Sequence, residues 1–134
     1  SSASKKKISS LDHYIWWLNS KRTTYILKKN EKKLLYFYDE LITLDGLNYS
    51  KQGWFISSND CTIKDVFFAL SWQKKHLLNK KNIDKSLGIT KKNNKLGKYI
   101  SKYLGWRPIK KDKDLIAIAK QIYKVDDSYL FYFR

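Results

Sequence analysis

The sequence predicts a mostly helical fold of the α+β class that ends in a β-hairpin. Apolar side chains recur with the period of an α-helix over residues 11–29 and again over residues 31–43. A third helical stretch, punctuated by glycines, covers residues 62–104. Residues 115–125 and 128–133 are then rich in β-branched and aromatic side chains, with Asp126 and Asp127 between them. These observations favour two N-terminal helices, a helical middle and a C-terminal hairpin.

The first ten residues are rich in Ser and Lys, and we expect them to form a flexible basic leader outside the fold. Residues 11–134 are then predicted to form one compact domain, with an N-terminal helical part at 11–56 and a second part at 60–134. The sequence contains no Met and begins with Ser. We therefore expect it to be a processed product or a segment of a longer protein.

In the N-terminal part, the period predicts helices over 11–29 and 31–43, although the triplet Tyr36-Phe37-Tyr38 also suits a buried strand. Asp45-Gly46 and Gly53 then mark a loop. A helix is expected over 62–72, with Thr62 as its N-cap and Asp65 in the place of the usual capping-box Glu. The lysine-rich residues 73–82 form the link to the next element.

The following segment predicts a helix-turn-helix. Residues 83–87 make one short helical turn, and Gly88 is expected in the left-handed conformation that ends it. Thr90 then caps a helix over 91–104, which Gly105 terminates. Beyond it, 115–125 and 128–133 form the hairpin, although 115–121 also suits a short helix because its two alanines are poor strand formers.

The charge of the chain is strongly positive and unevenly distributed. The 28 Lys and Arg residues exceed the 12 Asp and Glu residues by 16. Residues 1–70 carry 11 basic and 7 acidic side chains, whereas residues 71–134 carry 17 and 5. An AT-rich genome favours lysine codons, but codon usage alone would spread the excess evenly. A localised basic surface in the second half, facing a polyanionic partner, explains the distribution better.

The run IDKSLGITKKNNKLGKYISKYLGW, residues 83–106, resembles the winged helix-turn-helix family in its Leu-Gly-Ile turn and its closing Leu-Gly-Trp. A similar closing pattern occurs in the winged-helix modules attached to phage and plasmid replication helicases and primases. The resemblance covers residues 62–113 and implies a DNA-binding module of a larger replication, mobile-element or transcription protein, with its second helix in the major groove.

The residues expected to bind nucleic acid, with double-stranded DNA favoured over RNA, are lysines with a few polar neighbours. Lysines mostly supply charge to phosphates, while Asn and Ser can contact bases and phosphates. The set is Lys74, Lys75, Lys80, Lys81, Lys91, Lys92, Asn94, Lys95, Lys98, Ser101, Lys102, Arg107, Lys110, Lys111 and Lys113.

The sequence predicts no enzyme, cofactor or metal. Cys61 is the only cysteine, and His13 and His76 have no partner at a catalytic spacing. No glycine-rich phosphate loop occurs. The set Asp12, Glu31 and Lys33 has the residue types of a metal-dependent nuclease, but falls on predicted helices rather than on a strand hairpin. No apolar run is long enough to span a bilayer. A single cysteine excludes an internal disulfide framework, so an intracellular protein is expected.

Two alternative functions remain open at this point. The first is an RNA or single-strand binder that stacks bases on exposed aromatic rings. Core packing explains most of these rings better, with Trp17 and Trp54 expected to be the most exposed of Trp16, Trp17, Tyr36, Phe37, Trp54 and Phe55. The second is a protein-interaction domain that packs residues 11–43 against a partner.

Overall fold

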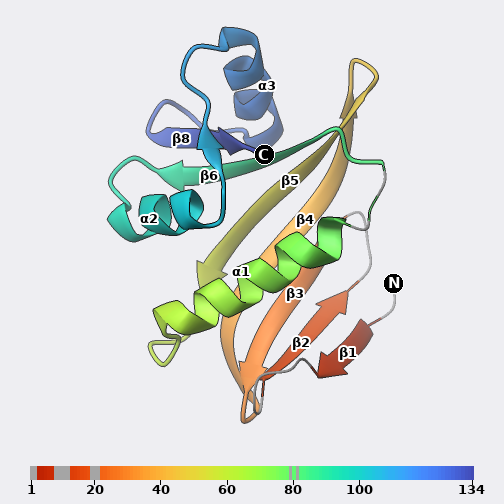
Figure 1. Cartoon of the computed structure of the whole chain (residues 1–134), viewed down its shortest axis with the longest axis vertical. Helices are drawn as coiled ribbons and strands as arrows, with labels where there is room; N and C mark the ends of the chain where they lie inside the picture. Colours follow the sequence, from red (N-terminus) through yellow and green to blue (C-terminus); the bar gives the residue numbers. More distant parts are fainter. Residues whose placement is uncertain (1–2, 8–12, 19–21, 79, 81) are drawn as a thin grey trace. The chain divides into compact units, whose positions relative to one another are not determined.

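The computed structural model describes all residues except 1–2, 8–12, 19–21, 79 and 81. Its strands pair in the order β1-β2-β3-β4-β5-β6-β8-β7, with three helices between them in the chain (Figure 1). Two compact units form, residues 1–40 with 53–81 and residues 41–52 with 82–134. Strands β4 (Lys32–Leu44) and β5 (Leu47–Ile56) contribute to both.

The first unit is an antiparallel sheet with one helix on it. It holds β1 (Ala3–Lys7), β2 (His13–Leu18), β3 (Arg22–Lys29) and the first part of β4, followed by α1 (Ile63–Leu78). Alternate residues of β3 and β4, among them Tyr25, Leu27 and Phe37, are fully buried. Helix α1 covers that face of the strands, with Val66 and Ala69 turned inward (Figure 1).

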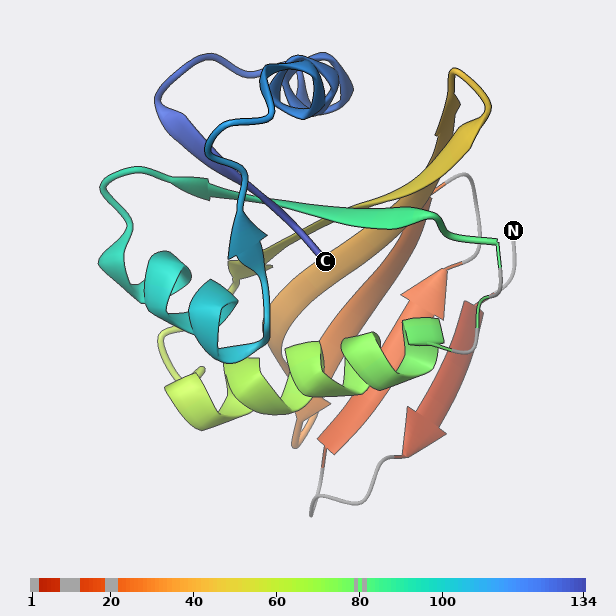
Figure 2. The same ribbon diagram turned by 45° about the horizontal axis from the view of Figure 1, so that its top comes forward.

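The second unit is built around a parallel pair of strands. It holds β6 (Lys85–Lys91), α2 (Lys95–Tyr103), β7 (Arg107–Pro108), α3 (Lys113–Tyr123) and β8 (Tyr129–Phe133). Strand β6 pairs in parallel with β5 and in antiparallel with β8. Helices α2 and α3 lie on opposite sides of β6 (Figure 2). Buried Leu87 and Tyr49 pack with Leu115 and Ile122 of α3.

The predicted mostly helical fold is wrong, because the described residues form a mixed α/β fold with an eight-stranded sheet. The described parts of 11–29 and 31–43 form β2, β3 and β4 rather than helices. Their β-branched and aromatic residues suit a sheet buried on one face. One tight turn joins β3 to β4, and a second joins β4 to β5. Asn30 and Glu31 both have positive φ, as do Asp45 and Gly46, which is the requirement of type I′ hairpin turns.

The predicted helix-turn-helix is also absent from the described residues. Residues 85–91, read as a helical turn and a cap, form β6, and Gly88 lies within that strand without positive φ. The N-cap of α2 is Asn94, not Thr90, and its side chain accepts from the Gly97 N–H at 2.9 Å. The predicted hairpin is wrong as well, because 113–123 is helical and β8 pairs with β6.

Some local predictions are confirmed. Helix α1 begins where expected, since the Asp65 N–H donates to Thr62 Oγ1 at 3.2 Å and the Thr62 N–H donates to Asp65 Oδ2 at 2.8 Å. Gly105 follows α2 with φ of 83°. The expectation of a flexible leader outside the fold is not among them, because residues 3–7 form β1, which pairs with β2. Among the described residues, no helix is long and apolar enough to cross a lipid bilayer.

Candidate functional site

Strands β5 and β6 pair over only three positions. Tyr49 lies opposite Lys85, Ser50 opposite Ser86, and Lys51 opposite Leu87. Strand β6 continues beyond Leu87 to Lys91 without pairing to β5. Over these residues its other edge is hydrogen-bonded to β8. A strand edge without a neighbour presents N–H and C=O groups that a ligand with amide groups can use.

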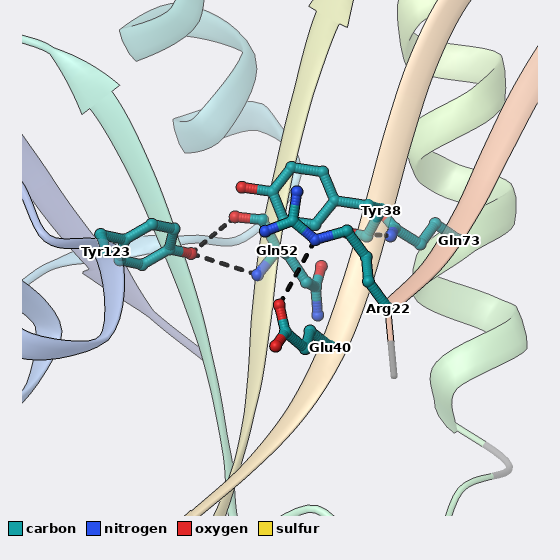
Figure 3. A network of polar contacts seen from close by, with 6 residues as sticks. All are labelled: Arg22, Tyr38, Glu40, Gln52, Gln73 and Tyr123. Atoms are coloured by element: carbon teal, nitrogen blue, oxygen red, sulfur yellow. Dashed lines mark hydrogen bonds and ion pairs between the residues drawn. The ribbon is translucent and has the colours of Figure 1, made fainter. Parts of the chain in front are cut away.

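The hydroxyl of Tyr123 closes the end of this short parallel pairing. Its oxygen lies 2.6 Å from the Gln52 carbonyl and accepts from the Gln52 N–H at 3.1 Å (Figure 3). The same oxygen lies 2.8 Å from the Leu87 carbonyl. A phenol has one hydrogen, so it donates to one of the two carbonyls at a time. One side chain of α3 therefore links β5 and β6 where their backbone pairing ends.

Local sequence fixes the place of Tyr123. Helix α3 starts at Asp112, whose Oδ1 accepts from the Leu115 N–H at 3.0 Å. It ends at Lys124, which is left-handed with φ of 57°. Leu115 and Ile122 anchor the helix in the core of the second unit, which leaves Tyr123 turned toward the strand junction.

Polar side chains continue from the junction. Buried Gln52 donates from Nε2 to Ser50 Oγ at 3.2 Å, and its Oε1 accepts from Arg134 Nη2 at 3.4 Å. The Arg134 guanidinium also donates to the Leu104 carbonyl at 3.0 Å and lies 4.0 Å from the centre of the Trp106 ring. Burial lowers the pKa of Arg134 to about 10. The guanidinium therefore remains charged at neutral pH and braces the junction.

Positive charge gathers where β6 leads into α2. Lys91 ends the strand, Lys92 follows, and Lys95 opens the helix, whose first turn holds no acidic residue. The N–H groups of a first helical turn and the helix dipole both favour an anion. This end of β6 can accept phosphate groups.

The first unit holds a separate polar cluster around Asp39, which is 6% exposed. Tyr25 donates to Asp39 Oδ2 at 2.7 Å, and Lys80 Nζ lies 3.6 Å from Oδ1. Burial, and then the Asp39 carboxylate, raise the pKa of Tyr25. His76 stacks on Trp72 at 4.8 Å between ring centres. We interpret this cluster as structural, because each carboxylate oxygen already faces a donor.

On the other face of the same strands, Arg22 packs over Tyr38. Its guanidinium lies 4.0 Å from the ring centre, and its Nε bonds Glu40 Oε1 at 3.3 Å (Figure 3). Gln73 Nε2 donates to the Tyr38 carbonyl at 3.1 Å. A Cβ on Gly53 would collide with the Tyr38 ring, so only glycine lets that ring lie against β5.

The lysines and polar residues predicted from sequence do not form one surface on a recognition helix. Lys74 and Lys75 are on α1, Lys80 follows it, and Lys81 lies outside the described residues. Ser101 is buried, 3.5 Å from the Thr90 hydroxyl, and Asn94 is occupied as a cap. The others are on or beside the second unit's elements: Lys91, Lys92, Lys95, Lys98, Lys102, Arg107, Lys110, Lys111 and Lys113.

The other residues weighed for catalysis give no alternative site. Burial, and then Asp65, raise the pKa of Cys61 to about 11, so the thiol stays protonated at neutral pH. Glu31 lies in the β3–β4 turn, Lys33 is on β4, and Asp12 lies outside the described residues. Within the described part of the chain, no three His, Cys, Asp or Glu residues are grouped to hold a metal. Of the aromatic rings, Phe37 is buried and Phe55 is exposed, while Trp54, expected to be exposed, is only partly so. The exposure predicted for Trp17, like that of Trp16, falls on side chains outside the described part of the structure.

Sequence reasoning missed Gln52, Tyr123 and Arg134 altogether. These residues meet only through the strand order, and no spacing along the chain links them. The one relevant signal is that residues 115–121 also suit a helix, because Tyr123 lies at the end of the helix that forms there.

No protein-family model and no curated protein matches the sequence. Solved structures do match. The GNAT domain of S. lividans PAT aligns over 85% of this chain and 60% of its own, at 8% identity and a TM-score of 0.62. The chain has the fold of GNAT acetyltransferases. Mycobacterium smegmatis RimJ, in complex with CoA-disulfide, aligns at 12% identity and a TM-score of 0.63, over 85% of this chain and 53% of that one.

A third GNAT structure is the Campylobacter jejuni N-acetyltransferase PseH in complex with acetyl coenzyme A. It aligns over 87% of this chain and 69% of its own, at 7% identity and a TM-score of 0.58. The present chain thus spans about three fifths of the S. lividans domain and about half of RimJ.

The GNAT fold overturns the winged-helix resemblance and the functions that it implied. The structures that share this fold are acetyltransferases, so the reading as a non-enzymatic DNA-binding module of a replication or mobile-element protein is wrong. The same holds for nucleic acid as the expected partner. The resemblance failed because Leu-Gly-Ile lies in a strand and Leu-Gly-Trp closes a single helix, so the pattern had no second helix to complete it.

Proposed function

We propose that the chain transfers an acyl group from an acyl-coenzyme A thioester to an amine. The observation that carries this proposal is the β5–β6 junction, whose backbone pairing stops after three positions where Tyr123 links the strands, in a fold whose solved examples are acetyltransferases. Because a fold alone does not assign a reaction, the junction supplies the chemical reason.

The residues present fit coenzyme A. Its pantetheine arm carries two amides, which suit the backbone groups of β6 beyond Leu87 on the edge that faced β5. Its phosphates suit Lys91, Lys92 and Lys95 at the start of α2, whose first turn holds no acidic residue, although Asp127 interacts with Lys92 from the loop before β8. When bound, the thioester supplies an activated acyl group.

The protein's own contribution is to hold that arm in one orientation. Tyr123 ties Gln52 to Leu87, and Arg134 fixes the Gln52 side chain from the other direction. In a rigid junction, binding the thioester costs less conformational entropy, because the protein groups that hold it are already in place. We assign Tyr123 the role of a positioning residue. Because acyl-CoA is made and used inside cells, we further propose an intracellular site of action.

A direct assay tests the proposal. The chain is incubated with acetyl-CoA and a panel of primary amines, release of the free thiol is followed by absorbance, and calorimetry measures the binding of coenzyme A. We expect thiol release that depends on both substrates. A folded chain that neither binds coenzyme A nor releases thiol with any amine would show that the proposal is wrong.

Tyr123→Phe tests the junction itself. Loss of one hydrogen bond of ordinary strength corresponds to roughly a two- to tenfold change in affinity. We expect KM for acetyl-CoA to rise within that range while kcat changes less. Tyr103→Phe, which removes a hydroxyl from an exposed ring, serves as the matched control and should leave both constants unchanged.

A further inference from the structure

Helix α2 carries a second apolar stripe that faces away from the core. Leu96, Tyr99 and Tyr103 are 41%, 50% and 71% exposed, and their spacing places them along one side of the helix. The adjoining side of the helix, with Gly97 and Ile100, is buried. The rings of Tyr99 and Tyr103 lie 5.4 Å apart, so the stripe is a continuous surface.

Lysines border this stripe on one edge. At 100° per residue, Lys95 and Lys102 fall next to Tyr99, with Lys98 beyond them. From Lys85 to Lys111 the sequence contains nine Lys and Arg residues and no Asp or Glu. The exposed surface of α2 is therefore apolar and aromatic next to the buried side and positive beyond it.

We propose that the Leu96–Tyr99–Tyr103 stripe, with Lys95 and Lys102, docks an acidic segment of a partner protein that also carries apolar side chains. Tyrosine is enriched at protein interfaces, because it combines a large apolar ring with a hydroxyl that can bond a carboxylate. The lysine border attracts acidic side chains and orients them. A second copy of this chain is a poor occupant, since two chains of net charge +16 repel each other.

This inference goes beyond the acyl-transfer proposal, and its test uses no acyl donor. The probe is a fluorescent synthetic peptide of 16 residues, in which Glu and Asp alternate with Leu and Phe at helical spacing. A permuted peptide of the same composition and a polyglutamate of the same charge are its comparisons. Anisotropy at fixed salt measures the binding of each to the whole chain.

We expect the amphipathic peptide to bind more tightly than both comparison probes. The double variant Tyr99→Ser with Tyr103→Ser should weaken its binding by roughly tenfold or more, since buried interface tyrosines each contribute above the average contact. Lys95→Glu with Lys102→Glu should weaken it at least as much. The control, Lys110→Glu with Lys111→Glu, makes the same change in net charge at exposed positions outside α2 and should have a smaller effect. Circular dichroism checks that each variant is folded.

Three results would overturn the proposal. Polyglutamate binding as tightly as the amphipathic peptide, with no loss in the tyrosine variant, would reduce the face to diffuse charge. Equal loss in the α2 lysine variant and the control would do the same. Binding to phosphatidylglycerol vesicles but not to the peptide would make the face a membrane surface. None of these results depends on whether the chain transfers acyl groups.

Discussion

Single residues in this chain are constrained more by close approach than by catalytic chemistry. A Cβ on Gly97 would lie 2.8 Å from Thr90 Cγ2 and 2.9 Å from Asn94 Nδ2. The Thr90 methyl sits on a stiff β-branched side chain, and the Asn94 side chain caps the helix, so neither can move freely. Gly97, which the sequence places simply within a predicted helix, therefore lets α2 approach β6 closely.

Gly97→Ala should therefore destabilise the protein. We expect a loss of about 1–3 kcal/mol from overpacking, even though alanine is the better helix former by about 1 kcal/mol. Urea denaturation measures the change. Gly88→Ala is the control, because its Cβ would meet the Trp106 ring at an ordinary 3.4 Å and the backbone there does not need positive φ. Equal losses in the two variants would contradict this explanation.

Tyr25 gives a second prediction at this scale. Its hydroxyl bonds the buried Asp39 carboxylate, so Tyr25→Phe should cost about 1.5–3 kcal/mol at neutral pH, the usual contribution of a hydrogen bond to a charged group. Tyr103→Phe, on an exposed ring, should cost almost nothing. The free energy of unfolding from urea titrations of each variant checks both.

The same hydroxyl makes the stability depend on alkaline pH. Burial first, and then Asp39, raise the pKa of Tyr25 above its ordinary 10.0, so the folded state holds this proton more tightly than the unfolded state. The contribution is complete below pH 10 and declines above it, by up to about 1.4 kcal/mol per pH unit. The wild type should lose more stability than Tyr25→Phe between about pH 9 and 11. Parallel pH curves for the two proteins would refute this linkage.

At the scale of elements, the sequence predicts helix ends correctly where capping residues define them, but it predicts helices in place of the long strands. Thr62 and Asp65 define the start of α1 by local hydrogen bonds, and Gly105 defines the end of α2. The strands β3 and β4 carry apolar residues on both faces, as in Leu34-Leu35 and Tyr36-Phe37, so strict alternation is lost and a helical period fits by chance. Asp45-Gly46 is predicted only as a loop, although an Asp-Gly pair between two apolar runs is a strong signal for the hairpin turn that joins β4 to β5.

The two hairpin turns differ in how well their residues suit them. Gly46 adopts φ of 79° without strain, whereas Glu31 adopts φ of 67° with a side chain attached. Glu31→Gly should therefore stabilise the protein by roughly 0.5–1 kcal/mol, and Gly46→Ala should destabilise it by a similar amount or more. Thermal unfolding of the two variants, run together, should shift the midpoint in opposite directions. A shift in the same direction would mean that the turns do not limit stability.

For the whole molecule, the sequence has the uneven charge described above, but the nucleic-acid partner inferred from that charge is wrong. The lysines were expected on a recognition helix because a basic helix that follows a glycine turn is typical of a helix-turn-helix. The structure instead distributes them around β6, α2 and the start of α3, in a fold shared with enzymes. Composition gives only the sign and distribution of the charge, whereas the tertiary arrangement, which joins Gln52, Leu87 and Tyr123, is the basis of the acyl-transfer proposal.

A net charge of +16 on 134 residues should also limit the stability of the folded chain. Like charges are closer together in the compact state than in the unfolded chain, so their repulsion favours unfolding. Salt screens exposed charges, with a Debye length of about 30 Å at 0.01 M and about 8 Å at 0.15 M. The melting temperature should therefore rise between these salt concentrations. The acid-free stretch from Lys85 to Lys111 should account for much of the increase.

Lys110→Glu with Lys111→Glu separates repulsion from general effects of salt. It lowers the net charge from +16 to +12, because each change removes one positive charge and adds one negative charge. Both side chains are exposed, so packing is unaffected. This variant should melt at a higher temperature than the wild type in dilute buffer, and the difference should shrink as salt is added. If the two proteins instead gain stability equally over the whole salt range, the repulsion is spread over the chain and the second half has no special part in it.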